Sequence, residues 1–184
     1  MGSPASVAED ERLRLFLALR LPEHVLDALE AWQRMHLHGV RTVPREHLHV
    51  TLAFLGHRPT GDLDAVVGAL REAAVGARPG LRLEAVRYRE TRAVAMVVLD
   101  DPSGGATALA ADVQGRLAGL GLYRREGRAW LPHVTVARFR TRPGLRLEPP
   151  AMGTFVPSDA AAYLSRLHPG GAQYAVLESV ALGG

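Results

Sequence analysis

The chain has 184 residues, of which 47% are hydrophobic, a formal net charge of +3 and no cysteine. This composition is typical of a soluble globular protein, and it excludes a disulfide framework and a thiolate metal site. No apolar run approaches the roughly 20 residues that cross a bilayer, and the N-terminus lacks a signal-peptide pattern, so we expect a cytoplasmic protein without membrane contact.

The pattern of apolar residues predicts one domain. In chain order, the predicted elements are a strand over 12–21, a helix over 22–37, a strand over 46–56 that ends at Gly56, a helix over 60–76, strands over 81–90 and 93–101, a helix over 103–121, a strand over 131–139, and two or three strands within 153–167 and 172–182. Adjacent strands mixed with helices predict an α+β fold rather than a doubly wound sheet. Residues 1–12 are expected to be a disordered leader and 13–184 a single domain, which we expect to be a monomer.

The basic residues of the chain are all arginines. Eight of them lie between Arg116 and Arg146, where Glu126 is the one acidic residue. Such a field suits phosphate or nucleic acid, because the guanidinium group matches phosphate oxygens with two hydrogen bonds. Scattered surface arginines, which a GC-rich genome favours, explain the same composition, and both interpretations stay open.

A short motif occurs twice. The stretch HVTLAF begins at His49, and HVTVARF begins at His133, each within an apolar strand. Residues two apart on a strand point to the same face, so His49 faces the same way as Thr51, and His133 the same way as Thr135. If the two strands lie together about a pseudo-two-fold axis, two imidazoles and two hydroxyls converge on one cleft.

Two imidazoles in one cleft can act as general base and general acid near neutral pH. Hydroxyl donors and an arginine would suit a tetrahedral phosphate between them, and no metal or cofactor is needed. Arg138 follows the second motif but falls on the core face of a regular strand, so it reaches the cleft only if that strand twists, bulges or ends there.

At these residues the sequence resembles the two-histidine phosphoesterase superfamily, whose signature is a pair of His-x-Thr-x motifs. It is most similar to the RNA 2′,3′-cyclic phosphodiesterase branch, historically called 2′-5′ RNA ligases. Four stretches carry the resemblance, RLFLALRLP, VPREHLHVTLAFLG, WLPHVTVARF and AAYLSRLHPGGAQYAVLES. Thr42 stands where the family often has Trp, and His47 where it often has Asn, which leaves substrate preference open.

The resemblance implies two α+β lobes with antiparallel sheets that face each other across a cleft, with helices outside. It implies that the substrate is an RNA or oligonucleotide with a 2′,3′-cyclic phosphate end, which is hydrolysed to a 2′-phosphate. His49 would donate a proton to the leaving 3′ oxygen and His133 would activate water. Thr51, Thr135 and Arg138 would bind phosphate.

Aromatic and histidine side chains near the motifs are candidates for substrate contact, namely His47, Phe16, Tyr163 and Trp130. Each aromatic could instead be a core residue, and we favour that interpretation for Phe16 and Trp130. The other histidines, at 24, 36, 38, 57 and 168, are expected on the surface.

Four alternatives remain at this stage. His47, His49 and His133 could hold zinc, although that leaves both threonines unexplained. The cleft could bind nucleotides or RNA ends without turnover. It could join RNA ends by ATP-independent 2′-5′ ligation, the reverse of hydrolysis. The motif residues could also be structural, as buried histidines bonded to threonines.

Overall fold

The computed structural model describes residues 12–77 and 79–182. In this range the elements are β1 (Arg12–Arg20), α1 (Glu23–His36), β2 (Arg41–Thr42), the short 3₁₀ helix η1 (Arg45–His47), β3 (His49–Pro59), the 3₁₀ helix η2 (Thr60–Asp62), α2 (Leu63–Val75), β4 (Leu83–Glu90), β5 (Val94–Asp100), α3 (Gly105–Gly119), β6 (His133–Arg138), β7 (Thr154–Phe155), β8 (Asp159–His168) and β9 (Gly171–Val180). The expected leader lies outside the described residues, except for Arg12, which already belongs to β1.

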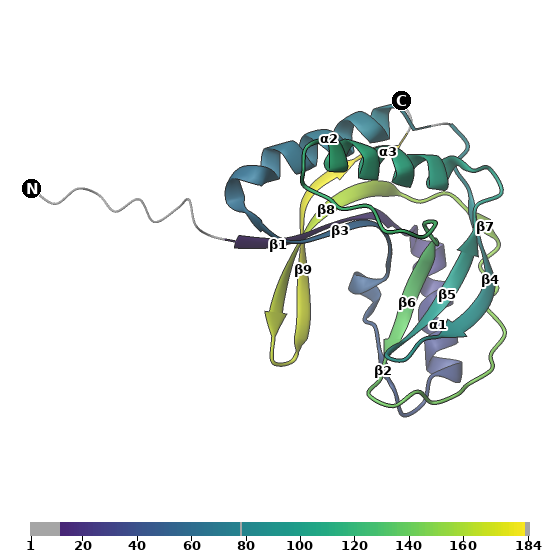
Figure 1. Ribbon diagram of the computed structural model, residues 1–184. Helices are drawn as coiled ribbons and strands as arrows, with labels where there is room; N and C mark the ends of the chain where they lie inside the picture. Colours follow the sequence, from purple (N-terminus) through teal and green to yellow (C-terminus); the bar gives the residue numbers. More distant parts are fainter. Residues whose placement is uncertain (1–11, 78, 183–184) are drawn as a thin grey trace, which may run out of the picture.

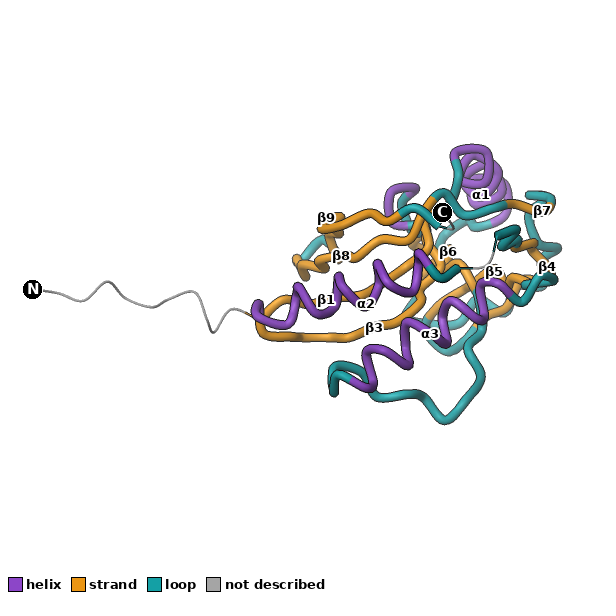
Figure 2. The backbone as a smooth tube through the Cα atoms, turned by 90° about the horizontal axis from the view of Figure 1, so that it is seen from above, coloured by secondary structure: helices purple, strands orange, loops and turns teal. Residues whose placement is uncertain are grey.

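The described strands form one antiparallel sheet in the order β7-β4-β5-β6-β3-β1-β8-β9, and β2 pairs with β6 at its edge. The predicted α+β class is therefore confirmed. Helices α2 and α3 lie side by side over β3 and β8, while α1 packs on the other half of the sheet (Figures 1 and 2). No helix within the described range is long and apolar enough to cross a membrane.

The two halves of the sheet meet at β3 and β6, the strands that carry the two motifs. They pair antiparallel at one position, Val50 opposite Val134. Outward from this pair, β1 and β8 flank β3 on one side, and β5 and β4 flank β6 on the other. The expected pseudo-two-fold arrangement is thus present, and the two lobes share a single open sheet because their motif strands pair at its centre.

The core faces of the motif strands are those that the alternation predicts. Val50, Leu52, Val134 and Val136 are all buried in the main hydrophobic cluster. Burial of four aliphatic side chains fixes the register, because a slip of one residue would turn them to the opposite face. The histidine and threonine of each motif are thereby held on the other face.

The predicted strand over 46–56 is wrong at both ends. Pro44 starts a 3₁₀ turn in which the His47 N–H donates to the Pro44 carbonyl, so His47 lies before the strand rather than on it. Gly56 does not end the strand. It adopts a φ of 69° beside an irregularity in the β1–β3 register, and β3 continues to Pro59.

Candidate active site

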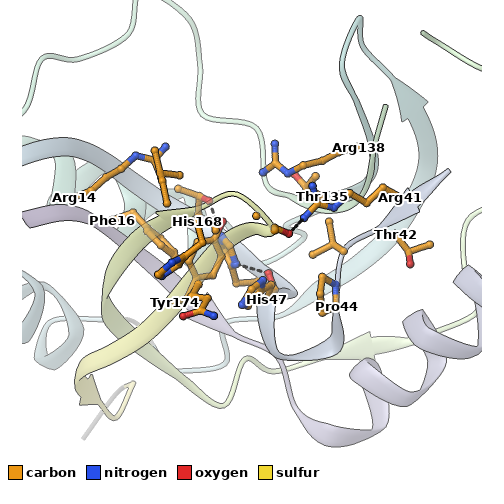
Figure 3. Close-up of a pocket in the computed structure, with 18 of the residues that line it drawn as sticks. Arg14, Phe16, Arg41, Thr42, Pro44, His47, Thr135, Arg138, His168 and Tyr174 are labelled. Atoms are coloured by element: carbon orange, nitrogen blue, oxygen red, sulfur yellow. Dashed lines mark hydrogen bonds between the residues drawn. The ribbon is translucent and has the colours of Figure 1, made fainter. Parts of the chain in front are cut away.

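A cavity of about 590 Å³ lies against the centre of the sheet, and 19 residues line it. Four of the five residues expected to do chemistry or bind phosphate are among them, namely His49, Thr51, Thr135 and Arg138. His133 is half-buried and does not line this cavity, but it is near enough that its charge lowers the pKa of His49. Figure 3 shows Thr135 and Arg138 on one side of the cavity and Phe16, His168 and Tyr174 on the other.

The two motif histidines are oriented in the same way. The Nδ1 atom of His49 lies 2.7 Å from the His47 carbonyl, and that of His133 lies 2.9 Å from the Leu131 carbonyl. A carbonyl can only accept, so Nδ1 carries the proton in each neutral ring and Nε2 is left with the lone pair. Both rings can therefore exchange a proton through Nε2.

His49 Nε2 lies 3.2 Å from Thr51 Oγ1, so these two side chains share one edge of the cavity. The purely structural alternative, a buried His–Thr pair, fits this geometry less well because both residues contact open space. Burial is the largest of the effects that lower the pKa of His49 to about 4, against the opposing hydrogen bond to the His47 carbonyl. The His49 imidazole is therefore neutral at pH 7.

Arg138 reaches the cavity because β6 carries a bulge. In the β5–β6 ladder, Thr135 pairs with Met96 and Ala137 pairs with Ala95, which leaves Val136 as an extra residue. Val136 and Ala137 are consequently both buried, and Arg138 returns to the face of Thr135. One of the conditions set by the sequence for Arg138 to contribute is thus met.

The first motif carries the same irregularity. In the β1–β3 ladder, Thr51 pairs with Ala18 and Ala53 pairs with Leu17, which leaves Leu52 unpaired at the position that Val136 has in β6. The repeat is therefore a repeat of backbone geometry as well as of residues. Phe54 comes back to the cavity face five residues after His49, as Arg138 does after His133.

Two glutamines hold these bulges. Gln114 of α3 donates to the Leu52 carbonyl at 2.8 Å, and Gln33 of α1 donates to the Val136 carbonyl at 2.8 Å and to the Val43 carbonyl at 3.0 Å. Helix α3 thus contacts the first motif, and helix α1 contacts the second. The Trp130 indole N–H adds a bond of 3.0 Å to the Thr51 carbonyl, so Trp130 supports the motif from behind.

Replacing Gln33 by leucine is expected to lower the free energy of unfolding by about 1–3 kcal/mol, because the Val43 and Val136 carbonyls lose the bonds from its amide and Val136 keeps only the bond from the Val43 N–H. Gln33 is only 5% exposed, so water cannot take the place of the amide. Denaturant unfolding measures the effect, with Arg34→Leu on the exposed face of the same helix as the matched control, expected within about 0.5 kcal/mol of wild type. Equal stability of the two variants would contradict the bracing role.

Three arginines that line the cavity have no acidic partner within residues 12–77 and 79–182. Among the described residues, none of the ion pairs involves Arg14, Arg41 or Arg138. Arg41 instead donates to the Gly170 carbonyl at the tip of the β8–β9 hairpin. Unpaired guanidinium groups give the cavity a positive charge, which suits an anionic ligand.

The arginine-rich stretch from 116 to 146 is, by contrast, mostly outside the site. Arg116 pairs with Glu72 and Asp112, Arg128 with Glu126, and Arg142 with Glu90. Arg138 alone of this stretch lines the cavity. For the ion-paired members the structure favours the second interpretation, that of surface arginines, because their charge is locally compensated.

Of the predicted substrate contacts, some line the cavity and others do not. His47 lines the cavity from η1, with its ring centroid 4.3 Å from that of Tyr174. Phe16 also lines it but is only 3% exposed, and its ring lies 4.9 Å from His49. Tyr163 is stacked on Phe16 at 4.8 Å, is buried, and does not line the cavity, because β8 places it in the small cluster behind Phe16.

Sequence reasoning missed several wall residues. Arg14, Arg41 and Phe54 line the cavity, as do Tyr174 and His168 from the β8–β9 hairpin. His168 was expected at the surface and is exposed, but on the cavity side. A signal for Phe54 was present, since it occupies the place in its motif that Arg138 has in the other.

The three histidines considered as a zinc site do not form one. Within residues 12–77 and 79–182, no group of three or more His, Asp or Glu side chains is placed to hold a metal ion. The alternative based on His47, His49 and His133 therefore has no ligand set.

Comparison with known proteins agrees with this geometry. A family model described as the 2′-5′ RNA ligase superfamily matches residues 21–168. The chain is 34% identical to an RNA 2′,3′-cyclic phosphodiesterase of Thermus thermophilus, over 94% of this chain and 91% of that protein. It is 26% identical to the protein of the same name from Escherichia coli, over 94% and 98%. A crystal structure of E. coli LigT complexed with 3′-AMP has the same fold, with a TM-score of 0.80 and 24% identity over 95% of this chain and 100% of that one. With most of its length matched by the family model, the chain belongs to the 2′-5′ RNA ligase superfamily.

Proposed function

We propose that this protein hydrolyses the 2′,3′-cyclic phosphate end of RNA to a 2′-phosphate, with His49 as general acid and His133 as general base. The observation that carries the proposal is the pairing of the two motifs at Val50 and Val134, which brings both sets of polar residues to the centre of one sheet. The names of the curated relatives, RNA 2′,3′-cyclic phosphodiesterase, support the same reaction.

The reaction is an in-line displacement at phosphorus. His133 Nε2 takes a proton from water, and the water oxygen forms a bond to phosphorus as the bond from phosphorus to O3′ breaks. His49 Nε2–H gives its proton to O3′, which leaves a 3′-hydroxyl and a 2′-phosphate monoester. Both proton transfers are assigned to imidazoles, so the proposed mechanism uses no metal and no cofactor.

The other polar groups would stabilise the charge that develops on the phosphate oxygens. Thr51 and Thr135 offer hydroxyl donors on the two motif strands, and Arg138 offers a guanidinium group beside Thr135. Donors already fixed in place act without reorganisation when the negative charge grows. The buried faces of β3 and β6 hold the two threonines on the cavity side, and the bulge in β6 turns Arg138 to the same side.

His49 must take up a proton before it can act as a general acid, and substrate binding favours this step. Its pKa of about 4 leaves it neutral at pH 7, and the charges of His133 and Arg138 add to the effect of burial. A phosphodiester anion placed between these groups offsets their positive charge and favours the protonated ring. We infer that His49 takes up its proton as the substrate binds.

The experiment that tests this function is incubation of the purified protein with cytidine 2′,3′-cyclic phosphate, with and without an RNA that carries a 5′-hydroxyl end. Release of a phosphate monoester with multiple turnover is the expected result. Tight binding without turnover would favour the binding-module alternative. A joined 2′-5′ product as the main product would favour ligation, which we expect to be minor because water is present at about 55 M.

A further inference from the structure

Phe54 and Arg14 form an exposed pair on the cavity wall that the proposed reaction does not use. The Phe54 side chain is 48% exposed although it is large and apolar. The Arg14 guanidinium lies over its ring, 4.7 Å from the ring centre, and Arg14 Nη1 donates to the buried Ser165 Oγ at 2.7 Å. The pair is thus held in place and open to a ligand.

The position of Phe54 on the cavity wall follows from the repeated motif. Phe54 and Arg138 occupy matching places after the two bulges, so the first motif contributes an aromatic ring to the cavity where the second contributes a guanidinium group. Arg14 and Arg138 lie far apart on opposite sides of the cavity in Figure 3. In the proposed function the cyclic phosphate binds at the Arg138 side of the cavity, so Arg14 is free to contact another part of the substrate.

A second aromatic surface in the same cavity lies directly beside His49. It consists of Tyr174 and His47, whose ring centroids are 4.3 Å apart, and the Tyr174 ring is 5.8 Å from that of His49. Along the sheet, Phe54 lies opposite Phe16 of β1 whereas His49 lies opposite Arg20, so Phe54 and His49 are four strand positions apart, roughly 13 Å. A ligand with one base can cover only one of these two surfaces, whereas a ligand with two bases can cover both.

We propose that Phe54 and Arg14 bind the nucleotide on the 5′ side of the cyclic phosphate end, an inference that rests on the proposed function. The base of that nucleotide stacks on the Phe54 ring, and Arg14 contacts the phosphodiester that joins the two nucleotides. Stacking on an aromatic side chain tolerates any base, and a guanidinium without an acidic partner is free to pair with phosphate. The preferred substrate is then an oligonucleotide end rather than a mononucleotide.

The test compares kcat/KM for three substrates with the same cyclic phosphate end, a mononucleotide, a dinucleotide, and a dinucleotide whose 5′ residue lacks its base. Wild type is expected to prefer the complete dinucleotide over the mononucleotide. Phe54→Leu is expected to reduce that preference at least about fivefold, because one stacked base is lost. Arg14→Gln is expected to reduce the preference for both dinucleotides and to weaken its dependence on salt.

Arg12→Gln is the matched control, since Arg12 is exposed on the same strand and does not line the cavity. Its dinucleotide preference is expected to equal that of wild type. A wild type without preference, or a preference unchanged in both Phe54→Leu and Arg14→Gln, would overturn the subsite. Failure of wild type to hydrolyse any of the three substrates would instead overturn the proposed function.

Discussion

Replacing His133 by alanine is expected to lower kcat for cytidine 2′,3′-cyclic phosphate by about 10²–10⁴-fold, and His49→Ala by a similar factor, because each removes a positioned proton-transfer group. The double variant is expected to be little worse than either single one, since the two rings act on one displacement. Steady-state rates at saturating substrate measure these effects.

The matched control for both variants is His24→Ala, a surface histidine on α1 that does not line the cavity. It is expected to keep the wild-type rate. If either motif variant also kept the full rate, with its fold confirmed by circular dichroism, the acid–base pair would be wrongly assigned. Retained rate in His133→Ala alone would point to another base, and retained rate in His49→Ala alone to another acid.

Arg138→Gln is expected to lower kcat by about 10²–10³-fold with a smaller effect on KM, because its charge matters most when negative charge develops on the phosphate. The kcat of Arg138→Lys is expected to lie between those of wild type and Arg138→Gln, since lysine keeps the charge but cannot form the two parallel hydrogen bonds of a guanidinium group. Arg140→Gln is the control, as Arg140 is exposed and outside the cavity. An effect of Arg138→Gln no larger than that of Arg140→Gln would remove Arg138 from the mechanism.

The central part of the site could be predicted because it follows from alternation along a strand. Val50 and Val134 go to the core, so the histidine and threonine beside each of them go to the other face. The repeat of the motif at His49 and His133 suggests the hypothesis that the two strands lie together, and the structure pairs them at Val50 and Val134. These are local rules applied twice, and the structure has the same geometry in both copies.

The bulges at Leu52 and Val136 could not be predicted, because a bulge depends on which neighbouring strand the chain pairs with. Regular alternation places Arg138 on the core face, and only the mismatch with β5 returns it to the cavity. The glutamines that hold the bulges are equally hidden, since Gln33 and Gln114 act across the fold on the motif of the other half.

The local density of arginines in the sequence does not predict which of them line the cavity. A run of arginines in the sequence says nothing of the carboxylates that the fold brings beside them, such as Glu72 beside Arg116 or Glu90 beside Arg142. Arg14 and Arg41 lie in less basic stretches, yet both are on the cavity wall, and neither has an acidic partner among the described residues. Ion pairing, rather than local density of charge, decides which arginines are free for a ligand.

The central claim is that His49 protonates O3′ while His133 activates water, and the position of the phosphate in the product tests it most directly. Phosphorus NMR of the product from cytidine 2′,3′-cyclic phosphate distinguishes the two monoesters. We expect cytidine 2′-phosphate, formed by wild type and Arg12→Gln and almost absent with His49→Ala or His133→Ala. Cytidine 3′-phosphate as the main product would contradict it, because the bond to O2′ would then be the one that breaks.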